Sequence, residues 1–163
     1  MEIKIRKYQE EDFLVAAELM DKLQDYLIPL DPLHRLARDE DYGKNYTKLL
    51  IDKITKNNGV IYLAETENKS VGLAAGIIED ASVEDAWGSI PSRSGRIIEL
   101  IVDEKQRGQN IGKKLMMETE KFLTENNCDV IRVEVFEPNK SAYEFYKKLG
   151  YNDRIIDLIK KVS

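Results

Sequence analysis

The strongest constraint on the fold is one continuous segment, residues 96–123, in which a strand-like run leads through a glycine-containing loop into a helix. The run RIIELIV at 96–102 is the most apolar strand-forming stretch of the chain, so we expect a buried and central strand there. Apolar residues then recur at helical spacing at Ile111, Leu115, Phe122 and Leu123. The segment therefore predicts a strand and a helix joined by the short loop DEKQRGQN.

This loop and the first turn of the predicted helix have the character of an anion site. The first N–H groups of a helix lack intrahelical partners and carry a partial positive charge, so phosphate oxygens bind there. Gly108 and Gly112 allow a close approach of the backbone, and Lys113 and Lys114 place cations in a turn that usually favours acidic residues. An ordinary tight turn before a solvated helix face fits the same residues. The glycine spacing matches neither the Walker loop nor the dinucleotide fingerprint, which excludes both.

The remaining chain alternates predicted strands and helices. We expect strands at 2–8, 60–67, 70–80, 129–136 and 154–162, helices at 10–27, 40–56 and 141–150, and a long polar connection at 80–95. Asn68 and Lys69 join two of these strands and indicate a hairpin. The order predicts an α/β (α+β) fold: a mixed, mainly antiparallel central sheet flanked by about four helices, with one helical crossover, in a single domain over 1–163.

Composition excludes several classes of function. The net charge of −5 disfavours a general nucleic-acid binder, and no apolar run is long enough to span a membrane. Cys128 is the only cysteine and His34 the only histidine, so neither a disulfide within the chain nor a His/Cys zinc site can form, and we expect no metal. A cytoplasmic protein fits these features. His34 is expected to be a surface or loop residue rather than a catalytic base.

Two motifs resemble those of the GNAT (Gcn5-related) N-acetyltransferase family. The loop Arg107-Gly108-Gln109-Asn110-Ile111-Gly112 resembles the family's R/Q-x-x-G-x-G/A cofactor loop, and EPNKSAYEFYKKLGY at 137–151 resembles its second signature. The matching positions of that signature are Asn139, Ala142, Tyr146, Gly150 and Tyr151. The resemblance covers nearly the whole chain and departs from the family pattern at Asn110, where glycine is usual. Asparagine tolerates left-handed backbone angles best among non-glycine residues, so we expect the loop to keep its geometry.

The resemblance implies acetyl-CoA as the acyl donor, which reacts with a primary amine directly through a tetrahedral intermediate. It assigns acetyl-CoA binding to the end of the 96–102 strand, the loop and the later signature: Leu100, Ile101, Val102, Arg107, Gly108, Gln109, Asn110, Ile111, Gly112, Lys113 and Asn139. Backbone N–H groups around Leu100, Ile101 and Val102 would stabilise the developing oxyanion.

The resemblance also matches Tyr146 to the family's tyrosine acid, which protonates the departing thiolate. A tyrosine at this spacing also fits a plain core position with Ala142, Phe145 and Leu149. The acceptor amine has to lose a proton, and Glu99 is a candidate base because its apolar neighbours would raise its pKa. Glu134 is the rival carboxylate, although a cross-strand ion pair explains it equally well. Water or another group stays open as the base.

In this family the first two helices and their connection shape the acceptor site. Residues 10–41 hold ten acidic and three basic residues, which favours a cationic small molecule or a protein amine as acceptor, unless these charges simply form a solvated face. A non-catalytic acyl-CoA-binding or sensing module on the same fold is the alternative function. The oligomeric state stays open, with the homodimer as the form frequent among relatives.

Overall fold

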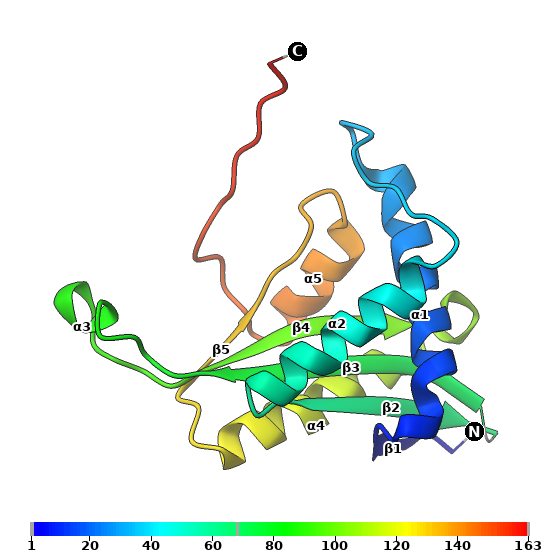
Figure 1. Ribbon diagram of the computed structural model, residues 1–163, viewed down its shortest axis with the longest axis horizontal. Helices are drawn as coiled ribbons and strands as arrows, with labels where there is room; N and C mark the ends of the chain where they lie inside the picture. Colours follow the sequence, from blue (N-terminus) through cyan, green and yellow to red (C-terminus); the bar gives the residue numbers. More distant parts are fainter. Residues whose placement is uncertain (1, 68, 163) are drawn as a thin grey trace.

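The computed structural model describes residues 2–67 and 69–162, so Asn68 of the predicted hairpin turn lies outside the described residues. The strands are β1 Lys4–Lys7, β2 Val60–Thr66, β3 Lys69–Glu79, β4 Ser94–Val102 and β5 Val130–Val133. The α-helices are α1 Phe13–Leu27, α2 Tyr42–Lys56, α3 Asp85–Gly88, α4 Ile111–Glu125 and α5 Lys140–Lys148 (Figure 1). Short 3-10 turns lie at η1 Glu10–Asp12, η2 Ile28–Leu30 and η3 Glu104–Gln106.

The strands form one sheet in the order β1-β2-β3-β4-β5. Neighbours pair antiparallel from β1 to β4, whereas β4 and β5 are parallel and connected by α4. The predicted fold class, a mainly antiparallel sheet with one helical crossover, is confirmed. The expected centre of the sheet is wrong by one strand, because β3 rather than β4 lies in the middle.

The predicted closing strand at 154–162 is also wrong. These residues are exposed and pair with no strand among the described residues, although their apolar pattern favours a strand. A strand needs a neighbour to satisfy its backbone groups, and this segment pairs with no strand of the described sheet, not even with the edge strand β5. The predicted strand at 129–136 shortens to β5 for a related reason, since its pairing with β4 ends at Val133.

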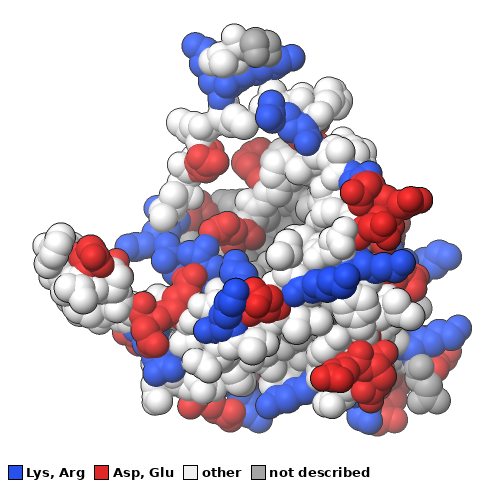
Figure 2. Space-filling model, viewed as in Figure 1, with Lys and Arg blue, Asp and Glu red and all other residues white. Residues whose placement is uncertain are grey.

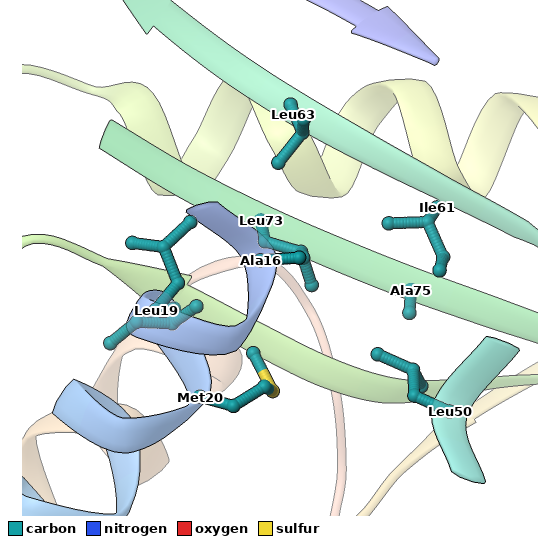
Figure 3. Packing of buried hydrophobic residues seen from close by; sticks show 9 residues of the cluster. Ala16, Leu19, Met20, Leu50, Ile61, Leu63, Leu73 and Ala75 are labelled. Atoms are coloured by element: carbon teal, nitrogen blue, oxygen red, sulfur yellow. The ribbon is translucent and has the colours of Figure 1, made fainter. Parts of the chain in front are cut away.

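Helices cover both faces of the sheet. On one face, Ala16, Leu19 and Met20 of α1 and Leu50 of α2 point towards the side chains of β2 and β3 (Figure 3). On the other face, Ile111 and Leu115 of α4 pack against Ala64, Val71 and Ala74. The core is therefore split into two apolar layers with the sheet between them, which fixes both helix layers relative to β4.

Helix α4 lies unusually close to the sheet because glycines face it. A Cβ atom on Gly76 of β3 would lie 2.7 Å from Thr119 Cγ2, and one on Gly95 of β4 would lie 2.7 Å from Leu123 Cδ1. Any larger residue would push the helix outwards. Nearer the N-terminus of α4, a Cβ atom on Gly72 of β3 would lie 3.1 Å from Leu115 Cδ1, so the helix is held close to the sheet on the side of the loop as well. Among the described residues, no helix combines the length and apolar character that crossing a membrane would require.

Candidate active site

The loop between β4 and α4 contains two left-handed residues. Gly108 has φ +80°, and Asn110 has φ 61° and ψ 13°. The expectation that asparagine can hold the loop geometry at this position is confirmed. The side chain of Asn110 makes no capping hydrogen bond to α4. The first-turn N–H groups, which belong to Ile111, Gly112 and Lys113, can therefore be offered to a ligand.

Two side chains of the loop are engaged within the protein. The Arg107 guanidinium lies 4.3 Å from the centroid of the Tyr26 ring, and its Nε donates to the Val102 carbonyl oxygen at 3.3 Å. Gln109 Nε2 donates to Gln106 Oε1 at 3.0 Å. These contacts order the loop, and they make Arg107 a link between the loop and α1.

Strands β4 and β5 separate at the level of the loop. Their pairing ends at Ile97 and Val133, whereas β4 continues to Val102 with β3 as its partner. A cavity of about 130 Å³, here called the notch, lies at this opening; Leu100, Val133, Phe136, Asn139, Ala142 and Tyr146 are among the residues that line it. Leu100, Ile101 and Val102 thus lie on the part of β4 beyond its pairing with β5. Asn139 also caps α5, because its Oδ1 accepts from the Ala142 N–H at 3.2 Å.

A β-bulge in β4 turns Glu99 towards α2. Ile97 pairs with Gly76 and Glu99 pairs with Ala75, which leaves Ile98 as an extra residue. Ile97 packs on the α4 side of the sheet, yet Glu99 accepts a short hydrogen bond from the Tyr46 hydroxyl of α2 on the other side. With regular alternation, residues 97 and 99 would share one face. The bulge therefore aims the carboxylate across the sheet.

Glu99 borders two adjoining cavities. It lines the notch, and it also lines a larger cavity of about 340 Å³, here called the α2 cleft, together with Tyr46, Leu49, Lys53, Arg96 and Glu134. Burial raises the pKa of Glu99 above its ordinary value, and the Tyr46 hydrogen bond and the Lys53 charge oppose part of this rise. The same burial, with the charge of Glu99, raises the pKa of Tyr46 strongly, so its hydroxyl stays protonated and donates.

Tyr146 closes the notch from α5. Its ring is buried and packs edge-on against Phe145 and Tyr151, with centroids 5.5 and 6.0 Å away. Burial and, to a smaller extent, the charge of Glu99 raise the pKa of the Tyr146 hydroxyl to about 12. The phenol is therefore protonated at neutral pH, and its hydroxyl is available as a hydrogen-bond donor at the notch.

The loop with its left-handed residues, the N-terminus of α4 and the separated strands β4 and β5 all lie at the C-terminal end of β4. The family model described as the acetyltransferase (GNAT) family matches residues 17–151. The chain belongs to the GNAT acetyltransferase family. It is accordingly an N-acetyltransferase, an acyltransferase for which the family implies acetyl-CoA as donor.

Relatives of this GNAT chain include two archaeal proteins. An uncharacterized N-acetyltransferase from Archaeoglobus fulgidus is 34% identical over 133 residues, covering 77% of this chain and 84% of the relative. Another, from Methanocaldococcus jannaschii, is 29% identical over 126 residues, covering 77% of this chain and 73% of the relative. Among solved structures, a mutant of the BH1408 protein from Bacillus halodurans superposes with a TM-score of 0.84 at 16% identity, over 98% of this chain and 99% of that one. The last similarity concerns the fold alone.

The rival carboxylate of this GNAT chain, Glu134, lies at the rim of the α2 cleft. It follows β5 directly, its side chain is 85% exposed, and it pairs with Arg96 of β4, which also contacts Glu79. A cross-strand ion pair, one of the two explanations that the sequence left open, is present. Glu134 thus differs from Glu99 in burial, although both line the notch as well as the α2 cleft.

Half of the ten acidic residues of 10–41 are in ion pairs, among them Asp41 with Lys44. Arg38 pairs with Asp21 and Asp25, Arg6 pairs with Asp12, and Lys22 pairs with Glu18. The Asp31 carboxylate accepts hydrogen bonds from the backbone N–H groups of Leu33, Arg35 and Leu36. None of the acidic residues of 10–41 lines the α2 cleft or the notch.

Three residues of the cleft escaped sequence reasoning: Tyr46, Lys53 and Arg96. Tyr46 is 53 residues from Glu99 in the chain, and no motif connects them. The only signal is a pair of tyrosines four residues apart on α2, since Tyr42 stacks on Tyr46 with centroids 5.4 Å apart. His34 and Cys128 line neither cavity, and burial raises the pKa of the Cys128 thiol, which disfavours a thiolate nucleophile.

Proposed function

We propose that this GNAT enzyme transfers the acetyl group of acetyl-CoA to a primary amine that enters through the α2 cleft. The observation that carries the proposal is the position of Glu99, which lines both the notch and the α2 cleft. A donor on one side and an acceptor on the other can then meet at Glu99, which is the more buried of the two carboxylates, Glu99 and Glu134, that line both cavities. Direct attack of the amine on the thioester, through a tetrahedral intermediate, needs no nucleophile from the protein.

On the donor side, we assign the pyrophosphate of acetyl-CoA to the loop. The left-handed residues Gly108 and Asn110 precede first-turn N–H groups, which suit phosphate oxygens, and exposed Lys113 adds a positive charge. The loop residues Arg107 to Gly112 contribute mainly backbone, because the side chains of Arg107 and Gln109 are bound elsewhere. Asn139 borders the notch in which the acyl end of the donor would lie.

Two groups serve the chemistry of the donor. Backbone N–H groups of Leu100, Ile101 or Val102 lie on the stretch of β4 beyond its pairing with β5, and we assign the oxyanion to them. The Tyr146 hydroxyl, held protonated by burial, is assigned the proton that the departing thiolate takes up.

On the acceptor side, Glu99 is the proposed base. Its raised pKa brings the carboxylate closer to the range in which it can accept a proton from an ammonium group. Exposed Glu134 is paired with Arg96 and fits better as a group that attracts a cationic amine to the rim of the cleft. These two carboxylates, rather than the acidic residues of 10–41, which line neither cavity, support an acceptor that is a cationic small molecule or a protein amine.

Calorimetric titration with acetyl-CoA and an amine panel test this function. The panel would contain a polyamine, an aminoglycoside, a lysine side chain in a peptide and a peptide N-terminus, with release of the CoA thiol as readout. We expect binding of acetyl-CoA and thiol release with at least one amine class. Binding without turnover on every amine would favour the acyl-CoA-sensing alternative, and no binding would refute the assigned donor site.

A further inference from the structure

One wall of the α2 cleft is a row of side chains on α2. The residues of this helix that line the cleft are Tyr46, Leu49, Leu50 and Lys53. Because residues three and four positions apart face the same side of a helix, these side chains follow one another along it. Tyr46 lies at one end of the row, where its hydroxyl donates to Glu99. Lys53 lies at the other end, seven residues and roughly 10 Å further along the helix axis.

Lys53 carries a charge that the protein does not neutralise. Its side chain is exposed and forms no ion pair with any of the described residues. The nearby charges of α2 are occupied, since Lys56 pairs with Asp52. The other cation of the cleft, Arg96 of β4, is paired with two carboxylates. Within the described part of the chain, Lys53 is therefore the one cation lining the cleft that has no partner.

The charge of Lys53 also acts on the carboxylate at the reacting end of the cleft. It opposes part of the rise in pKa that burial causes at Glu99, so its field reaches that carboxylate. A cation at this position repels a second cation that enters the same space. An acceptor that is positively charged along its whole length, such as a polyamine, would bind against this repulsion.

The charges that line the cleft are arranged in an order. Glu99 and Glu134 line both the cleft and the notch, whereas Lys53 lines only the cleft. Between Tyr46 and Lys53, the row on α2 presents Leu49, whose side chain is 66% exposed. The cleft thus has carboxylates where it adjoins the notch, an apolar wall, and an ammonium group at the far end. An acceptor with an amine, an apolar link and an anionic group matches this order.

The face of the molecule around α2 has charges of both signs. Figure 2, in which α2 lies towards the viewer, shows blue and red side chains next to one another over this helix and on the side towards α3. Such a surface does not favour a polymer of one charge sign. The cleft itself, about 340 Å³, lies near the lower end of the range for small-molecule sites, roughly 300–1,000 Å³. Its size therefore suits a small molecule or the end of a peptide.

We propose that Lys53 determines acceptor specificity by binding an anionic group, a carboxylate or a phosphate, that the acceptor carries in addition to its amine. The amine reacts at Glu99, the linking atoms lie along Leu49, and the anionic group accepts hydrogen bonds from the Lys53 ammonium group. A peptide end with an acidic side chain and a small ω-amino acid share this chemistry. The inference rests on the function proposed above and narrows its acceptor to amines that also carry a negative charge.

Matched pairs of acceptors test the proposal on the full chain at saturating acetyl-CoA. One pair is a short peptide with glutamate beside its N-terminal residue and the same peptide with glutamine there; the other pair is aminohexanoate and its amide. Thiol release gives kcat and KM for each acceptor. We expect kcat/KM to be about tenfold higher for the anionic member of at least one pair, mainly through a lower KM, because the contact forms before the reaction. The pair that shows the preference identifies the acceptor as a peptide or a small molecule.

Substitutions on α2 localise the contact. In Lys53→Gln we expect the preference to fall to less than about threefold, and in Lys53→Glu we expect it to reverse. The ratio within a pair is the readout, because both members use the same base and a shift in the pKa of Glu99 changes both rates alike. Lys48→Gln is the matched control, since Lys48 is an exposed lysine of the same helix that lines neither cavity.

The outcomes distinguish this inference from the function on which it rests. A preference for anionic members that Lys53→Gln abolishes and Lys48→Gln keeps supports the inference. Equal kcat/KM within both pairs overturns the inference alone, as does a preference that persists in Lys53→Gln or a polyamine that reacts faster than both anionic members. Binding of acetyl-CoA without thiol release on any amine overturns the proposed function, and the inference with it.

Discussion

The donor side and the acceptor side of the site are built in different ways. The donor side rests on a short segment, in which Gly108 and Asn110 set the backbone and α4 follows at once. The acceptor side rests on contacts between distant elements, above all the hydrogen bond between Tyr46 of α2 and Glu99 of β4. Binding of the donor should therefore depend on local backbone geometry, whereas reaction with the acceptor should depend on the environment of one carboxylate.

The substitution Glu99→Gln should break the acceptor side and spare the donor side. A glutamine keeps the shape of the side chain and loses the basic oxygen, so we expect kcat to fall by about 1,000-fold, within the usual range for a general base. Thiol release measures the rate, and calorimetry should give an unchanged Kd for acetyl-CoA. Glu134→Gln is the matched control, with a much smaller loss. A reversed order of the two effects would assign the base to Glu134.

Glu99→Gln, which should lower the activity, should raise the stability of the fold. Burial raises the pKa of Glu99 in the folded chain, so the fold favours the protonated form and loses stability as rising pH ionises the carboxyl group. We expect Glu99→Gln to raise the Tm at pH above the folded-state pKa, with the gain disappearing below about pH 4, where the carboxyl is protonated in both states. Thermal unfolding over this pH range measures it. A lower Tm at high pH would mean that the carboxylate stabilises the fold.

Tyr146→Phe should have the next largest effect. The ring stays packed between Phe145 and Tyr151, and only the proton donor is lost. Thiolates leave more readily than most groups because their pKa is near 8.5, so we expect a loss in kcat of about 100-fold, smaller than for the base. Single-turnover thiol release with saturating acetyl-CoA measures the step. An unchanged rate would mean that Tyr146 only packs in the core and does not donate the proton.

Asn110→Val tests the donor side by itself. A β-branched residue at φ 61° is strained by about 1–2 kcal/mol, so we expect the loop to lose its shape and acetyl-CoA to bind about tenfold more weakly. Asn110→Gly, which accepts the same angles, is the matched control and should change the Kd by less than about threefold. Calorimetry distinguishes them. Equal affinities for both variants would show that the left-handed residue does not matter for the donor.

The donor side of the site could be predicted from the sequence better than the acceptor side, for a physical reason. The strand, loop and helix of 96–123 could be predicted because periodicity, glycine and asparagine act within a few residues. The bulge at Ile98 and the partnership of Tyr46 with Glu99 could not be predicted, since they depend on how α2 crosses the sheet. The prediction of a strand at 154–162 failed for the opposite reason. The local pattern indicates a strand, but a strand exists only with a partner, and residues 154–162 pair with no strand of the described sheet.

The smallest effect belongs to Tyr46→Phe and probes the link between α2 and the carboxylate. The Tyr46 hydroxyl lowers the pKa of Glu99, so its removal should raise that pKa further and shift the acid limb of the kcat/KM profile to higher pH. Above the limb, the rate should stay within about tenfold of the parent, because the base itself is intact. Tyr42→Phe is the matched control, since the Tyr42 hydroxyl donates to Gln24 Oε1 at 3.3 Å and not to Glu99. An equal shift of the acid limb in both variants would mean that stacking of the two rings is responsible. No shift in either variant would mean that the titrating base is not Glu99, the carboxylate that Tyr46 contacts.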